Sequence, residues 1–220
     1  MAKLNIVGVG PGSPDYVTPA ARKIVQQAQV VIGAQRSLDL FPADIKGECL
    51  VLTAKNLSSV LKQAAESVRS GKDLALLSTG DPGFSGLLHT VLESGLFDTS
   101  EIRVVPGVSS IQACAARLKI SWDNTRLFTF HDVVSDAEKE KLISAVKCSR
   151  TILLLPNSRS FTPKDIANFL IELDVDKEMP VYICENITFE NEKITQTTLG
   201  KVIGQTFGSL CVMVIKQTSN

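Results

Sequence analysis

The chain has 220 residues, 44% of them hydrophobic, and its 23 basic and 23 acidic side chains give a formal net charge of zero. That length suits one large or two small domains, and the balanced charge argues against nucleic acid as a partner. The absence of a Cys-x-x-Cys pair, a secretory signal and a long apolar run argues against a zinc site, a disulfide framework and a membrane span, and favours a cytoplasmic protein.

The first half of the chain alternates strand-like apolar runs with helical patterns. Short apolar runs predict strands at Leu4–Val9, Val30–Gly33, Cys49–Leu52, Leu74–Ser78 and Ile102–Val105. Apolar residues at helical spacing predict helices at Pro19–Ala28, Leu57–Ser70 and Gly86–Glu93. Thr18 before Pro19 is typical of a helix start, and Gly71 and Gly95 are typical of helix ends. This alternation predicts a mostly parallel sheet that is covered on both faces.

The pattern changes near Lys119–Arg126, and a second set of elements follows. Strands are expected at Leu127–Phe130, Thr151–Leu155, Val181–Cys184, Lys193–Thr198 and Leu210–Ile215. Helices are expected at Ala137–Val146 and Pro163–Leu173, with a short helical stretch between the last two strands. This ending fits a mixed sheet with an antiparallel edge. The sequence therefore predicts two α/β domains, 1–119 and 120–220, with a ligand site at strand carboxyl ends and between the domains.

A Gly/Pro loop within Gly8–Pro14 follows the first predicted strand. The dinucleotide pattern needs a third glycine where Ser13 stands, and a P-loop needs a Gly-Lys-Ser/Thr run that is absent here. Pro11 and Pro14 also lack the N–H groups that a phosphate nest requires. We interpret the loop as a stiff stretch of bare backbone beside a ligand, and a simple strand-to-helix turn is the alternative.

Two further Gly/Pro loops follow predicted strands. Ser78–Gly86 contains Asp81 before a proline, which is typical of a helix N-cap and also places a carboxylate where the amine or ribose hydroxyls of a ligand would lie. Val104–Gln112 contains Ser109 three residues before Gln112, at the spacing of a capping box. Loops of this kind at three strand ends favour a ligand site over turns alone.

Candidate catalytic side chains are few. His89 is predicted on a helix, as a solvated or packed side chain, whereas His131 ends a predicted strand and is a candidate to face the cleft. No Ser/His/Asp spacing points to a nucleophile, and no His/Asp/Glu cluster points to a metal.

The three loops, in this order, resemble those of the tetrapyrrole methylases, enzymes that methylate corrin and related macrocycles. The matching segments are Val7–Pro14, Gly80–Phe84 and Pro106–Ser110. The segments Val31–Leu38, Ser78–Phe84 and Cys184–Ile187 resemble the branch that methylates C5 of the corrin-ring precursor cobalt-precorrin-7 in cobalamin biosynthesis. The resemblance spans nearly the whole chain.

The resemblance implies an S-adenosylmethionine-dependent C-methyltransferase with two α/β domains, paired as a homodimer, with the cofactor between the domains. By motif match it assigns cofactor contacts to Pro11, Gly80, Asp81, Phe84, Ser109, Ser110, Leu155 and Pro156. The tetrapyrrole substrate carries several carboxylates, for which Arg36 and Arg159 are candidate partners. His131 is the candidate for the base that takes the proton lost after methyl transfer.

One departure from the branch is visible. The branch continues the first strand of its second domain as His-Gly-Arg, whereas this chain has His131, Asp132 and Val133, so substrate contact by that arginine is not carried over. Bifunctional relatives carry a further domain for C15 methylation and decarboxylation. The chain ends at Asn220, so we expect a separate protein to act at C15. The alternatives are a family member acting at another ring position, a diphthine synthase, or a non-catalytic module that binds a macrocycle or nucleoside.

Overall fold

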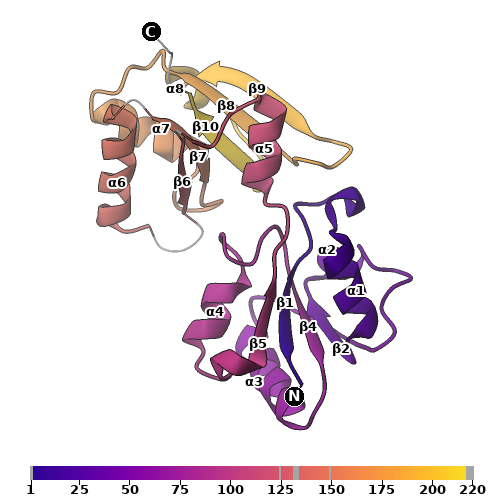
Figure 1. Ribbon diagram of the computed structural model, residues 1–220. Coiled ribbons are helices and arrows are strands. Elements are labelled where there is room, and N and C mark those ends of the chain that lie inside the picture. Colours follow the sequence, from indigo (N-terminus) through magenta and orange to yellow (C-terminus); the bar gives the residue numbers. More distant parts are fainter. Residues whose placement is uncertain (1, 124, 131–133, 149, 217–220) are drawn as a thin grey trace. The chain divides into compact units, whose positions relative to one another are not determined.

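A computed structural model describes residues 2–123, 125–130, 134–148 and 150–216 (Figure 1). The chain divides into two compact units, Met1–Ser109 and Ser110–Asn220, which we call the first and second units. Each unit contains one five-stranded sheet flanked by helices, so the expected α/β fold is confirmed. The division comes earlier than the expected boundary after residue 119, because α5 (Ser110–Leu118) packs on strands of the second unit.

The first sheet is entirely parallel, with the strand order β3-β2-β4-β1-β5. Its strands are β1 (Leu4–Gly8), β2 (Val30–Gly33), β3 (Glu48–Val51), β4 (Leu74–Ser78) and β5 (Ile102–Val105). Every residue of β1, β2 and β4 is buried, as parallel strands with both faces covered must be. Each predicted strand of this half is confirmed within one residue of its expected bounds.

Helices cover both faces of the first sheet. They are α1 (Pro19–Gln27) and α2 (Gln35–Leu38) on one face, and α3 (Leu57–Arg69) and α4 (Leu87–Glu93) on the other. Short 3-10 turns lie at η1 (Pro14–Tyr16) and η2 (Thr99–Glu101). The predicted helix signals are confirmed: the Thr18 hydroxyl accepts the Ala21 N–H at 3.1 Å, and Gly71 and Gly95 have left-handed φ values of +93° and +61°.

The second sheet is mixed, with the strand order β6-β7-β10-β8-β9. Its strands are β6 (Thr125–Thr129), β7 (Thr151–Leu155), β8 (Pro180–Glu185), β9 (Lys193–Thr198) and β10 (Cys211–Ile215). The expected antiparallel edge is β9, which pairs with β8. In addition, β10 lies in the middle of the sheet and runs antiparallel to both β7 and β8.

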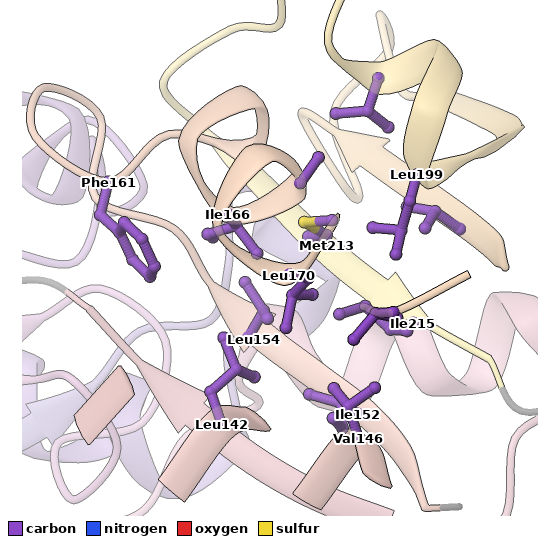
Figure 2. Packing of buried hydrophobic residues seen from close by; sticks show 14 of the residues in the cluster. Leu142, Val146, Ile152, Leu154, Phe161, Ile166, Leu170, Leu199, Met213 and Ile215 are labelled. Atoms are coloured by element: carbon purple, nitrogen blue, oxygen red, sulfur yellow. The ribbon is translucent and has the colours of Figure 1, made fainter. Parts of the chain in front are cut away.

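The core of the second unit lies between this sheet and the helices α6 (Asp136–Lys147), α7 (Pro163–Glu172) and α8 (Leu199–Val202). Figure 2 shows Leu154, Leu170 and Met213, from β7, α7 and β10, within one apolar cluster. Full capping boxes begin α6 and α7. Within the described ranges, no helix has the length and apolar character that a membrane crossing needs.

Candidate functional site

The three Gly/Pro loops meet at the carboxyl edge of the first sheet. They are the β1 loop (residues 9–13), the β4 loop (79–86) and the β5 loop (106–109), and β1 lies between β4 and β5. A Cβ added to Gly107 would lie 2.4 Å from the Gly80 carbonyl oxygen and 2.7 Å from the Gly8 Cα. The three backbones can touch because glycine places no side chain between them.

Backbone hydrogen bonds join the β1 loop to the β4 loop. The Val9 N–H donates to the Ser78 carbonyl at 3.0 Å, and the Gly80 N–H donates to the Gly10 carbonyl at 2.8 Å. Gly10 and Gly80 have φ values of +82° and +71°, in the left-handed region where other residues are strained. These two glycines therefore fix how the two loops approach each other.

The Asp81 carboxylate joins the β4 loop to the β5 loop. Its Oδ1 accepts the Gly83 N–H at 2.8 Å, and its Oδ2 accepts the Gly107 N–H at 3.0 Å. We call Asp81 with these two N–H groups the loop clip. The predicted helix N-cap at Asp81 is wrong: α4 begins at Leu87 with Gly86 before it. The carboxylate bonds instead to N–H groups outside any helix.

The space beside Gly80 is open. Apart from Gly80 and its two chain neighbours, the Ser109 Cα, at 3.7 Å, is the one heavy atom of the described residues within 4 Å of a Cβ added there. Ser109 is 7% exposed and directly precedes α5, as its capping-box spacing predicts. Pro11 is buried, and the Phe84 N–H donates to the Asp81 carbonyl at 3.3 Å. The structure thus brings the predicted cofactor residues of the first unit together.

Arg36 lies beside these loops. Its Nη2 is 3.4 Å from the Thr79 Oγ1, and Thr79 directly precedes Gly80. The Ser37 Oγ is also 3.4 Å from the Thr79 Oγ1. Sequence reasoning singled out Arg36 but missed the two hydroxyls, because a contact between side chains 42 positions apart leaves no signal in a single sequence.

The remaining predicted site residues belong to the second unit. Leu155 ends β7, where its carbonyl accepts the Phe130 N–H at 2.9 Å, and Pro156 follows it. Arg159 is exposed, and its backbone N–H donates to the Asn157 Oδ1 at 2.8 Å. His131 lies outside the described residues. No group of three or more potential metal ligands occurs in the described parts of the chain.

The Cys184–Ile187 segment begins with a buried thiol. The Cys114 Sγ of α5 lies 3.0 Å from the Cys184 Sγ of β8, and both side chains are fully buried. The contact with Cys184, together with burial, raises the pKa of Cys114. Burial also raises the pKa of Cys211 to about 12. Neither Cys114 nor Cys211 is therefore a thiolate nucleophile near neutral pH.

After this segment the backbone turns through two left-handed residues. Asn186 and Thr188 have φ values of +49° and +74°, which is unfavourable for a β-branched residue such as threonine. Glu192 holds the turn: its Oε2 accepts the Thr188 N–H at 2.7 Å and its Oε1 accepts the Arg117 Nε at 2.8 Å. Burial raises the pKa of Glu192, but these two hydrogen bonds outweigh burial, so its pKa lies below the ordinary value.

Comparisons with known proteins agree with these observations. A family model described as tetrapyrrole (corrin/porphyrin) methylases matches residues 3–203. The chain is 39% identical to a protein of Methanocaldococcus jannaschii named "Probable cobalt-precorrin-7 C(5)-methyltransferase", over 96% of each chain. It is 31% identical to the cobalt-precorrin-4 C(11)-methyltransferase of Priestia megaterium, over 90% of this chain and 79% of that one. A crystal structure of cobalt precorrin-4 methyltransferase CbiF superposes with a TM-score of 0.79 at 27% identity, covering 97% of this chain and 94% of the other.

Proposed function

The chain belongs to the tetrapyrrole (corrin/porphyrin) methylases, and from this premise we propose that it methylates C5 of a corrin-ring precursor. The methyl donor is S-adenosylmethionine, the substrate is cobalt-precorrin-7, and the pathway is cobalamin biosynthesis. Similarity to a relative named for this reaction, over nearly the whole chain, supports the proposal. The structural observation that carries it is the set of three joined loops with open space beside Gly80.

The residues at the loops fit S-adenosylmethionine. Its adenosine and amino-acid parts carry hydroxyl, amine and carboxylate groups, which backbone N–H and C=O groups at strand ends can bind without a phosphate nest. Each Asp81 oxygen has a second lone pair, so the loop clip can also accept a ligand N–H or O–H. We assign cofactor contacts to Pro11, Gly80, Asp81, Phe84, Ser109, Ser110, Leu155 and Pro156.

The chemistry of the reaction explains why the chain has few catalytic side chains. S-adenosylmethionine supplies a methyl group on a positively charged sulfur, and the conjugated macrocycle supplies an electron-rich carbon. The chain therefore needs no activated serine or cysteine, and its task is positioning. Holding two reacting atoms about 3–3.5 Å apart can lower the barrier by roughly 7–11 kcal/mol. The loop clip and the glycine contacts give the loops the rigidity that such positioning needs. His131 stays the candidate base.

The proposal includes an assembly and a location. As in the family, the chain would work as a homodimer in the cytoplasm, and a separate protein would perform C15 methylation and decarboxylation. Light scattering of the purified chain tests the dimer, since the 220 residues have a mass of 23.8 kDa and a dimer has twice that mass.

A second candidate function is methylation at a different ring position. The 31% identity to the C(11)-methyltransferase over 90% of this chain favours C11 as that position. The fold does not separate the two positions, because the solved cobalt precorrin-4 methyltransferase shares it with this chain.

Binding of S-adenosylhomocysteine is the first test. A ligand that binds only the native state raises its stability by mass action, so we expect micromolar affinity and a higher melting temperature. No shift of the melting temperature at millimolar S-adenosylhomocysteine would contradict cofactor binding by this chain.

The position of the new methyl group is the second test. The chain is incubated with cobalt-precorrin-7 and 13C-methyl-labelled S-adenosylmethionine, and NMR of the product locates the methyl carbon. We expect one methyl group at C5 and no released carbon dioxide. A methyl group at C11, or decarboxylation by this chain alone, would contradict the proposed position.

A further inference from the structure

Arg36 lacks an ionic partner among the described residues. It is exposed on α2, and its guanidinium lies 3.4 Å from the Thr79 hydroxyl, at the long end of the hydrogen-bond range. Asp39, three residues further along the chain, accepts the Gln35 side-chain amide at 2.8 Å instead. The guanidinium is therefore available to donate two hydrogen bonds to one anion.

Ser37 and Thr79 give this arginine two neighbouring hydroxyls. The Ser37 side chain is 2% exposed, and its hydroxyl meets the Thr79 Oγ1 at 3.4 Å. With respect to the described residues, this long hydrogen bond is the one that the Ser37 hydroxyl makes. A buried hydroxyl in that state is incompletely satisfied, which is unfavourable unless a further acceptor or donor arrives. The three polar groups thus converge on one point without satisfying one another.

The position of this trio is fixed by the fold. The strands β2 and β4 are parallel neighbours, so α2 and Thr79 follow them at the same edge of the sheet. Leu38 packs α2 into the apolar core on this face. Thr79 directly precedes Gly80, beside which the loops are open. A ligand bound to the loops beside Gly80 would therefore be a neighbour of Arg36, Ser37 and Thr79.

We propose that Arg36, with the hydroxyls of Ser37 and Thr79, binds a carboxylate on the rim of the macrocycle. The inference rests on the proposed function, because it needs an acidic macrocycle at the loops. A carboxylate has the planar pair of oxygens that a guanidinium binds with two parallel hydrogen bonds. Its remaining lone pairs accept from the hydroxyls. The other candidate, Arg159, bonds through its backbone N–H to Asn157, and its guanidinium makes no hydrogen bond to a hydroxyl of the described residues.

Steady-state kinetics with cobalt-precorrin-7 test the subsite. For Arg36→Gln we expect KM for the pigment to rise about 10- to 100-fold, with kcat within threefold and the affinity for S-adenosylhomocysteine unchanged. Arg36→Lys keeps the positive charge but loses the pair of parallel N–H donors, so its KM should lie between those of wild type and Arg36→Gln. Thr79→Val should raise KM by a smaller factor, and combined with Arg36→Gln it should add less than its separate effect.

The matched control is Arg103→Gln, an exposed arginine on β5 of the same unit, which should leave KM unchanged. If Arg36→Gln and Arg36→Lys both have the wild-type KM, the subsite is overturned. The proposed function would still stand in that case, because the enzyme would still methylate the pigment. An equal rise of KM in Arg103→Gln would also overturn it, since the effect would then be general electrostatics. Wild-type protein that binds S-adenosylhomocysteine but neither binds nor methylates the pigment would overturn both proposals. If Arg36→Gln fails to fold, the Arg36→Lys and Thr79→Val variants decide.

Discussion

The two units shape the loops at their strand ends by different means. In the first unit, Gly8 and Gly107 carry no side chain where the backbones touch. In the second unit, the turn after β8 places Asn186 and Thr188 in the left-handed region, and the Glu192 carboxylate holds it there by accepting the Thr188 N–H and the Arg117 Nε–H. The glycine contacts of the first unit depend on the absence of side-chain atoms, whereas the turn of the second unit depends on ionised side chains.

This difference predicts which changes disrupt the glycine contacts and which disrupt the turn. Glycine contacts do not titrate, but a single added methyl group must push two backbones apart. A turn held by a carboxylate tolerates a change of side chain better, because its loss costs about the energy of its hydrogen bonds. That turn responds to pH, since the carboxylate must stay ionised.

The largest effect is expected from Gly107→Ala. The new Cβ would meet the Gly80 carbonyl oxygen at 2.4 Å, so we expect a loss of about 3 kcal/mol or more in the free energy of unfolding, together with loss of S-adenosylhomocysteine binding. Urea unfolding and calorimetry measure the two effects. The control is Gly204→Ala in the second unit, whose Cβ would come no closer than 4.0 Å, at the Lys201 carbonyl oxygen, to any described residue beyond its chain neighbours. Similar small effects in both variants would refute the close contact.

The next effect is expected from Asp81→Asn, which replaces one acceptor oxygen of the loop clip by an NH2 donor. One bond, to Gly83 or Gly107, is lost, and we expect a loss of about 1–3 kcal/mol in the free energy of unfolding and weaker S-adenosylhomocysteine binding. Asp176→Asn is the matched control, because Asp176 accepts an N–H two residues ahead at 2.9 Å but makes no hydrogen bond to a second loop within the described parts of the chain. If Asp81→Asn is no more harmful than this control, the clip does not hold the loops.

A smaller effect is expected from Glu192→Gln, which removes the charge that faces Arg117. Because the pKa of Glu192 is lowered on folding from 4.5, its contribution is present above that value and is lost as the pH falls through the folded pKa. We expect about 1–2 kcal/mol at pH 7 and a smaller difference from wild type near pH 3. Urea unfolding at both pH values measures it, with the exposed Glu93→Gln as control. A difference independent of pH would contradict the ionic role.

The cysteines should show the smallest effect on the free energy of unfolding but a large difference in the rate of alkylation. Cys49 and Cys148 are exposed, whereas Cys114 and Cys184 are buried. Iodoacetamide at pH 8 should therefore label the exposed pair within minutes and the buried pair only after unfolding in urea, because burial keeps the reagent away from both buried thiols and raises the pKa of Cys114, whose thiolate is the reactive form. Peptide mass spectrometry reports each site. Fast labelling of Cys114 in the folded protein would contradict the sealed packing of α5 on the second sheet.

Sequence patterns predicted the elements well where one signal was local and strong. The buried runs of β1, β4 and β7 and the Thr-Pro start of α1 fall at the expected positions. Asp81 shows the limit of such signals. Its Asp-Pro pair resembles a helix start, but the N–H group that bonds its Oδ2 belongs to Gly107, 26 positions away. Strand order is subject to the same limit, because the pairing of β10 between β7 and β8 depends on partners that are distant in the sequence.

The central position of β10 has a consequence for synthesis on the ribosome. The strands of the first sheet are complete once Val105 has been made, whereas β7 and β8 gain their shared neighbour only with Cys211–Ile215. At about 5–20 residues per second, the 30 residues from the end of β8 at Glu185 to the end of β10 at Ile215 take roughly 1.5 to 6 s. During that time β7 and β8 both have an open edge that could pair with another nascent chain. Chaperone protection of the nascent polypeptide should therefore matter most for the second half of this protein.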